Sequence, residues 1–347
     1  MILWALALLL LQVSPELRQH VEAGLKAKAG GDLDTAIREF QRVAELAPGL
    51  AASHVNLGAV YYEKKDYAQA IPPLKKALEL NPDLPGAQGM LGAALLAQGY
   101  AAEAIPHLEK GQLEHLLGVA LLEAGRPRDA VDRLETALQK SPGDEDLLYY
   151  LSQAHARLSR QLFDKMRSEK PSSPRTQQMI GEAMAAAGNR VEAEKHLHSA
   201  LDVRPDLRGV HFALGELHLE SGDYEKAETE FRAEVALTPA SAAAAYKLGL
   251  VLLRRGQTTE ALSHLKRADQ LMPGMPETQL ELGKALLASG DDAGAEAAFR
   301  KVLEVESTSQ LAQAAHFQLA QIYRKQGRAA DADRHLKLFQ QLRGKAK

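Results

Sequence analysis

A small residue that recurs at a fixed period constrains this chain more than any other feature. Glycines lie 34 residues apart in two runs, at Gly24, Gly58, Gly92 and at Gly215, Gly249, Gly283. Gly118, Ser152, Gly181 and Ala320 take the same position at irregular intervals, which gives ten copies over residues 17–347. A unit of this length cannot bury an apolar face alone, so the copies must stack on one another.

Each copy predicts two helices joined by a tight turn. Around Gly58, the residues His54, Leu57 and Tyr61 share one face at helical spacings of three and four. A glycine marks the turn in most copies, an alanine follows five residues later, and a large apolar residue such as Leu74 comes four residues after the alanine. Small residues let two helices approach closely, so we expect the large apolar residue to fill the seam between them.

This pattern resembles the tetratricopeptide repeat family. The resemblance implies an all-α, right-handed superhelical solenoid of about ten helix pairs with a concave inner face. Aromatic residues make up only 5% of the chain, which also argues against a strand-rich fold. We place the copies near residues 17–50, 51–84, 85–110, 111–144, 145–173, 174–207, 208–241, 242–275, 276–312 and 313–346.

The repeat is irregular between residues 105 and 175. Eight residues are missing between Gly92 and Gly118, so the helices there are predicted to be shortened or fused. The copy around Ser152 has no turn glycine, and residues 156–175 continue as one helical pattern up to the loop at 171–174. A longer connection spans residues 305–313. We interpret the irregularity as ordinary drift in preference to a change of pitch that divides the array into two arms.

The N-terminus holds ten consecutive apolar residues at positions 2–11. This run is shorter than the roughly 20 residues of a membrane span, and it suits the apolar core of a secretory signal. Residues 1–14 are therefore predicted to be a signal peptide that directs the protein to the periplasm, the cell envelope or the exterior. The alternative is an apolar helix that caps the open end of the first repeat of a cytoplasmic protein. No stable membrane span is expected.

The sequence lacks the residues and motifs that several classes of function require. Lys and Arg total 42 against 45 Asp and Glu, a balance that gives no electrostatic footprint for nucleic acid. The chain has no cysteine, and it contains no phosphate-binding loop, no HExxH and no GxSxG motif. We expect no enzymatic activity, no cofactor and no metal.

Histidines occur on the predicted core stripe and not in ligand patterns. His211 and His218 share a helix face, but other copies carry packed residues at these positions. His20, His54 and His316 occupy the position equivalent to His211. A packed, singly hydrogen-bonded imidazole is therefore favoured over a metal ligand.

A second stripe on the first helix of each copy is the candidate binding surface. Its residues lie three before, one after and four after the anchor, and these spacings keep them on one face. In the family this face lines the concave groove, so the resemblance implies an apolar groove that takes a protein or peptide. The candidate residues are Asn56, Tyr62, Leu96, Leu122, Tyr149, Phe212, Leu219, Tyr246 and Leu253.

The sequence disfavours one type of ligand that some members of the family bind. Some members bind C-terminal carboxylates through Lys, Arg and Asn in the first three copies, and here Asn56 matches one such position. Val21, Leu25, Gly86 and Met90 stand where that clamp needs polar or basic groups.

The sequence therefore predicts a non-enzymatic scaffold that binds a protein or peptide and assembles a cell-envelope complex. The alternatives are a cytosolic adaptor and, from another class, the repeat segment of a larger enzyme such as a glycosyltransferase. The sequence does not define the oligomeric state.

Overall fold

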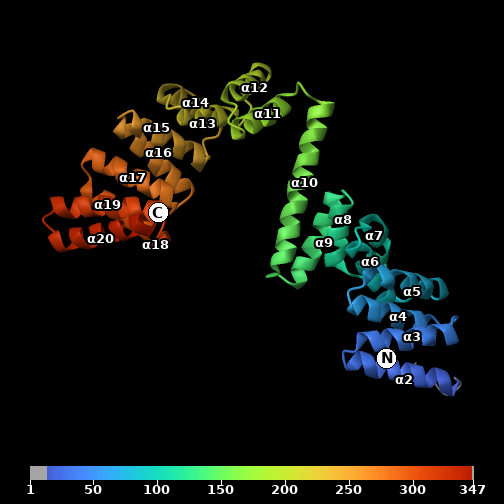
Figure 1. Cartoon of the computed structure of the whole chain (residues 1–347). Coiled ribbons are helices and arrows are strands. Elements are labelled where there is room, and N and C mark those ends of the chain that lie inside the picture. The colour runs from blue at the N-terminus through green and yellow to red at the C-terminus, as the bar shows by residue number, and fades with distance from the viewer. Residues whose placement is uncertain (1–13, 346–347) are drawn as a thin grey trace. The chain divides into compact units, whose positions relative to one another are not determined.

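The computed structural model describes residues 14–345, which form nineteen helices, α2 to α20, and no strand (Figure 1). The predicted all-α solenoid is confirmed. The apolar segment predicted as a signal or cap lies outside the described residues, apart from Ser14. The Ser14 hydroxyl accepts a hydrogen bond from the Leu17 amide at 3.2 Å and so caps the first described helix.

Helices alternate as first and second members of antiparallel pairs. The first four pairs are α2 (Pro15–Ala29) with α3 (Leu33–Leu46), α4 (Ala51–Glu63) with α5 (Tyr67–Leu80), α6 (Pro85–Ala97) with α7 (Ala101–Gly111), and α8 (Glu114–Glu123) with α9 (Pro127–Lys140). A single helix, α10 (Glu145–Glu169), follows. The later pairs are α11 (Pro174–Ala186) with α12 (Arg190–Val203), α13 (Val210–Glu220) with α14 (Tyr224–Leu237), α15 (Ala242–Arg254) with α16 (Thr258–Leu271), α17 (Pro276–Ser289) with α18 (Asp292–Val305), and α19 (Gln310–Lys325) with α20 (Ala329–Lys345).

The turn inside each pair has a recurring local structure. In four pairs an aspartate caps the second helix by accepting a hydrogen bond from the amide three residues later: Asp32, Asp66, Asp223 and Asp291. The residue at the turn has positive φ, which glycine adopts without steric cost. Lys65, with φ of 61°, takes this position in the second pair, so the backbone turn persists there without glycine.

The seam between paired helices forms as the sequence predicts. Leu74 and Phe231 are fully buried and lie directly over the anchor glycines of their own pairs. A Cβ atom added at Gly58 would lie 2.6 Å from Leu74 Cγ, and one at Gly215 would lie 2.6 Å from Phe231 Cε1. The anchor must be small because the large apolar side chain occupies that space.

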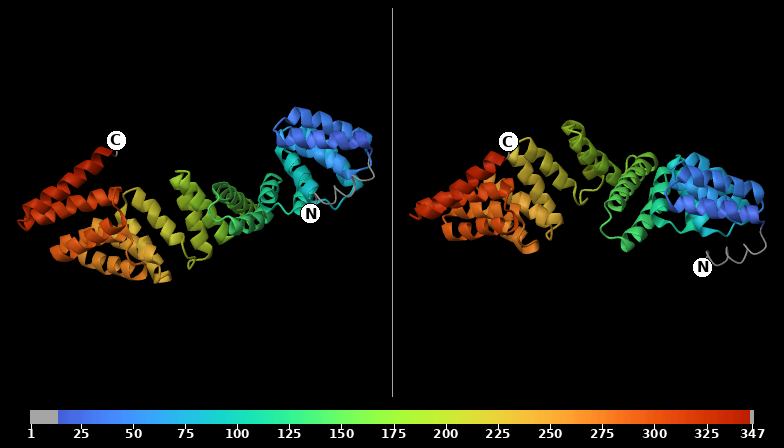
Figure 2. Two further views of the ribbon diagram at one scale, coloured as in Figure 1. Left: turned by 90° about the horizontal axis from the view of Figure 1, so that it is seen from below. Right: turned by 60° about the horizontal axis from the view of Figure 1, so that its bottom comes forward.

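The chain divides into two compact units, and the boundary between them falls within α10. Unit 1 ends at Asp164 and unit 2 begins at Lys165. Within each unit the pairs follow one another in chain order (Figure 2). Unit 1 contains one apolar cluster around Phe40 and a larger one from Ala70 to Ala154. Unit 2 contains three clusters, around Leu197, Phe231 and Phe299.

The irregular copies correspond to altered helices. The two helices of the short region, α7 and α8, are separate and shortened to 11 and 10 residues. The copy around Ser152 is the continuous 25-residue helix α10, as its missing turn glycine predicts. The described residues therefore hold nine helix pairs and one long helix where ten pairs were expected. The division at Asp164 falls in the irregular region.

Candidate functional site

A groove in unit 1 is the candidate site. Four first helices, α4, α6, α8 and α10, line it together with Tyr67 of α5 and the residue that caps α10, Asp144. Its volume is about 570 Å³. The lining residues are Tyr62, Tyr67, Ala93, Leu96, Ala97, His115, Leu116, Val119, Glu123, Asp144, Asp146, Leu147 and Tyr150.

The packing inside each helix pair explains why the groove side chains remain accessible. Leu74, Leu108 and Leu134 of the second helices fill the seams of their pairs and are fully buried. The groove residues of the first helices lie on other faces, and several are only half-buried. The fold therefore leaves a row of apolar and aromatic groups with accessible area.

A second, smaller pocket of about 250 Å³ adjoins the groove and shares Tyr62 and Ala93 with it. Its lining includes Gly86, Gly89 and Gly111. A Cβ atom added at Gly111 would lie 2.6 Å from the Cα atom of Gly89, so the end of α7 touches the backbone of α6. The short copy thus produces a groove extension in which three glycines lie among larger side chains such as Met90 and Leu113.

Two pairs of tyrosine rings involve groove residues. The rings of Tyr62 and Tyr67 meet edge to face with centroids 5.4 Å apart, and those of Tyr149 and Tyr150 do the same at 5.4 Å. Burial raises the pKa of Tyr62 above the ordinary tyrosine value, with a further contribution from Tyr67. The phenol of Tyr62 therefore stays neutral at physiological pH and can donate a hydrogen bond.

Candidate residues of unit 1 divide into those the groove includes and those it does not. Tyr62 and Leu96 line the groove. Asn56 is half-buried on α4 and lines neither the groove nor its extension. Leu122 was expected on the groove surface, but its side chain is only 3% exposed and belongs to the core. Tyr149 is 59% exposed, and the adjacent Tyr150 lines the groove in its place.

Leu122 belongs to the same core cluster as Leu147 and Ala154 of α10, which also bonds to the main chain at the end of α8. Arg157 donates a hydrogen bond to the Leu122 carbonyl oxygen at 2.8 Å, and Gln161 donates one to the Gly125 carbonyl oxygen at 3.3 Å. A first helix of 13 residues, such as α4, would reach the position of Arg157, so only the contact of Gln161 depends on the extra length of α10. The two bonds join α10 to the C-terminal end of α8 and to the turn after it.

In unit 2 the four candidates lie on α13 and α15 and are half-buried. Phe212, Leu219 and Leu253 pack against the core cluster that contains Phe231, and the rings of Phe212 and Phe231 are 5.6 Å apart. Tyr246 packs against the cluster around Phe299, and burial raises its pKa to about 12. Part of the surface of each of these four side chains is therefore buried between neighbouring helix pairs.

Ion pairs lie on the first helices of unit 2. Lys247 Nζ is 2.7 Å from Glu216 Oε1, which joins α15 to α13. Lys284 Nζ is 2.5 Å from Oε1 of the buried Glu281 on α17. Two carboxylates on the first helices of this unit, Glu216 and Glu281, are thus paired with lysines of the same unit.

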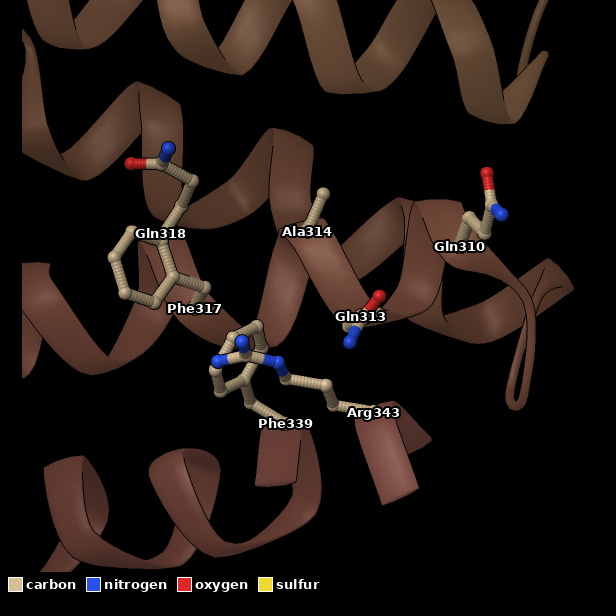
Figure 3. A pocket seen from close by; sticks show the side chains of 7 residues that line it. All are labelled: Gln310, Gln313, Ala314, Phe317, Gln318, Phe339 and Arg343. Atoms are coloured by element: carbon tan, nitrogen blue, oxygen red, sulfur yellow. The ribbon is translucent and has the colours of Figure 1, made fainter. Parts of the chain in front are cut away.

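A further pocket, of about 340 Å³, lies between α19 and α20 (Figure 3). Phe317 of α19 and Phe339 of α20 approach with centroids 5.2 Å apart, and Arg343 lines the same pocket. The remaining lining residues are Gln310, Gln313, Ala314 and Gln318. Among the described residues, the only charged side chain that lines this pocket is the cation Arg343.

The histidines pack as the sequence predicts. His20 Nδ1 lies 2.7 Å from Glu39 Oε2, and His211 Nδ1 lies 2.7 Å from Glu230 Oε2 on the paired helix. His54 Nε2 lies 2.9 Å from the Pro48 carbonyl oxygen. Among the described residues, no group of three or more His, Asp or Glu side chains is arranged to hold a metal ion.

His316 gives a pH-dependent expectation. Its Nδ1 lies 2.9 Å from His335 Nδ1, and burial together with that imidazole lowers the pKa of His316 to about 4. An unfolded histidine has a pKa of about 6.5, so the unfolded chain binds more protons between these values. The stabilising contribution of neutral His316 is therefore present above about pH 6.5 and is lost as pH falls toward 4.

A matched variant isolates this effect. His316→Gln reproduces the Gln–His pairs that the chain already has, Gln88 with His107 at 2.6 Å and Gln177 with His196 at 2.7 Å. We expect the melting temperature of the variant to fall less than that of the parent between pH 7 and pH 5. Thermal melts across this range provide the measurement, and parallel pH profiles for the two proteins would contradict the assignment.

Within residues 14–345 no helix combines the length and apolar character that a membrane crossing requires.

Family comparisons agree with the repeat pattern. Models described as tetratricopeptide repeat match residues 51–84, 85–110, 121–160, 179–242, 212–276, 252–315 and 313–337. These matches together cover most of the chain and occur in both units. No curated protein sequence matches the chain.

Solved structures of low identity are also similar to this chain. A crystal structure of MamA shares 21% identity over 48% of this chain and 96% of its own, with a TM-score of 0.45. The APC/C hetero-tetramer Cut9–Hcn1 shares 13% over 96% and 88%, with a TM-score of 0.45, and yeast Tom70 shares 16% over 94% and 91%, with a TM-score of 0.39. The family assignment rests on the repeat models and not on these structures.

Proposed function

Because this chain belongs to the tetratricopeptide repeat family, we propose that it is a non-enzymatic scaffold that binds a protein or peptide in the groove of unit 1. The observation that carries the proposal is the groove itself, in which Tyr67 of α5 meets two tyrosines and several aliphatic side chains of successive first helices.

Physical chemistry supports this use of the groove. Aromatic side chains bury a large area at a low cost in conformational entropy, and they dominate many binding energies. A volume of about 570 Å³ falls within the range of roughly 300–1,000 Å³ that is typical of ligand pockets. The groove is also elongated by its extension, which suits a peptide segment more than a compact small molecule.

The cellular setting is a further part of the proposal. We place the scaffold in the assembly of a cell-envelope complex, with the ten apolar residues at positions 2–11 as support. Mass spectrometry of protein purified from its native host tests this placement. We expect a mature N-terminus between about residues 12 and 20. Intact Met1 on cytosolic protein would instead support the adaptor.

Site-specific photo-crosslinking tests the binding function. A photo-reactive phenylalanine analogue replaces Tyr62, which lines the groove, or Tyr100, which is exposed at the start of α7 outside the groove. After irradiation in cells of the native host, we expect a discrete protein adduct at position 62 and none at position 100. Adducts only at position 100, or at neither position, would refute the groove as the binding surface.

A further inference from the structure

We propose that the segment bound in the unit 1 groove carries a lysine or arginine next to aliphatic side chains. This inference rests on the proposed function and specifies the chemistry of the partner. It follows from the charge of the groove, from the contrast with unit 2 and from the small residues that line the groove.

Carboxylates are the only charged groups of fixed sign that line the groove. Glu123, Asp144 and Asp146 are all exposed, and neither Lys nor Arg lines the groove. In the described part of the chain, none of the three forms an ion pair with a lysine or arginine, although many other carboxylates do. A cation brought by a partner would therefore meet three carboxylates that no lysine or arginine of the described residues pairs with.

One of these carboxylates is held in place by the backbone. Asp144 Oδ1 accepts hydrogen bonds from the amides of Asp146 and Leu147 at 3.0 Å and 3.1 Å, which fixes it at the start of α10. Side chains that are fixed before binding lose little entropy when a partner arrives. Asp144 thus provides an ordered acceptor at the rim, close in sequence to the groove residues Leu147 and Tyr150.

Two carboxylates on the first helices of unit 2 differ from those of the groove because they are paired with lysines. There, Glu216 pairs with Lys247 and Glu281 pairs with Lys284. The pocket between α19 and α20 has Arg343 as its only charged lining residue. An acidic rim around an apolar groove is thus a feature of unit 1 among the pockets and faces described here.

Small residues determine what can fill the rest of the groove. Ala93 and Ala97 line it beside Leu96, and Gly86 and Gly89 line its extension. Such positions let the partner's backbone approach closely, while the tyrosines and Leu96 offer apolar contact to aliphatic side chains. The chemistry that fits is an aliphatic side chain in the groove with a basic side chain at the rim.

An array of ten-residue peptides of random sequence, probed with the full chain, tests this inference. We expect the bound peptides to be enriched in Lys or Arg beside Leu, Ile or Val. The best binders are then titrated against a groove variant, Glu123→Gln with Asp144→Asn and Asp146→Asn. Asparagine retains the helix-capping acceptor, so the substitution at position 144 removes the charge but preserves the cap.

The control variant removes the same charge elsewhere on unit 1. Glu109→Gln, Asp132→Asn and Glu135→Gln change three exposed carboxylates on α7 and α9 that do not line the groove. We expect the groove variant to bind about tenfold more weakly and with less dependence on salt, and the control variant to bind like the parent protein. Equal affinity of the parent protein and the groove variant would overturn the inference.

The outcomes separate this inference from the proposed function. Peptides that bind in the groove without a basic preference would overturn the inference and leave the scaffold function intact. If no peptide binds and the photo-reactive residue at position 62 captures no protein, both the inference and the proposed function fail. If the chain instead self-associates through the groove, sedimentation would show a dimer that the groove variant abolishes, and the inference of a separate basic partner would be wrong.

Discussion

Phe231→Ala should lower the free energy of unfolding of unit 2 by about 3–5 kcal/mol, because a large side chain is removed from a fully enclosed site. Phe231 is completely buried, and its ring lies against the space that a Cβ on Gly215 would occupy. The α13–α14 pair depends on this contact to keep its two helices together. Urea denaturation followed by circular dichroism gives the overall change, and hydrogen exchange locates it in α13 and α14.

Phe212→Ala provides the control for this prediction. Its ring touches Phe231 at a centroid distance of 5.6 Å, but it is only half-buried. We expect a clearly smaller loss of stability, since truncation leaves a site that solvent can fill. Equal losses for the two variants would show that the candidate stripe of unit 2 is core between neighbouring pairs.

Gly111→Ala should destabilise unit 1 by about 1–3 kcal/mol through overpacking. The added Cβ would lie 2.6 Å from the Gly89 Cα atom and 2.7 Å from the Gly89 nitrogen. These are backbone atoms that cannot rotate away, so α6 and the end of α7 must separate. Because both glycines line the extension of the groove, hydrogen exchange should rise along α6 as the melting temperature falls.

Gly143→Ala is the matched control in the same unit. A Cβ atom at Gly143 would meet no heavy atom within 4 Å, and its φ lies outside the positive region. We expect its stability to stay within about 0.5 kcal/mol of the parent. If Gly111→Ala behaves like Gly143→Ala, the close contact of α6 and α7 does not hold in solution.

Much of the fold could be predicted from the sequence because most repeats carry the same residue types at the same spacings. The anchor glycine, the alanine and the large apolar residue recur at fixed spacings, and Gly58 with Leu74 shows the contact that they specify. Missing turn glycine in the copy around Ser152 correctly indicated a continuous helix. These features are local, so periodicity alone reveals them.

The groove was harder to predict because it depends on packing between copies. The stripe derived from regular copies placed Leu122 and Tyr149 on the groove surface. Leu122 is instead buried in the core of unit 1, and Tyr150 lines the groove in place of Tyr149. The carboxylates at positions 144 and 146 were not among the candidate binding residues derived from the sequence. Only the groove geometry relates them to Glu123 and to the tyrosines.

The central claim is that a partner binds through the unit 1 groove, and two adjacent tyrosines test it most directly. Tyr150 lines the groove, whereas Tyr149 is the more exposed residue and lies outside it. The measurement is the affinity of Tyr150→Ala and Tyr149→Ala for the partner captured by crosslinking, with thermal melts to confirm that both variants fold. We expect Tyr150→Ala to lose about 1–3 kcal/mol of binding free energy and Tyr149→Ala to bind like the parent. If Tyr149→Ala weakens binding and Tyr150→Ala does not, the partner uses the outer face of α10 and the groove is not the binding site.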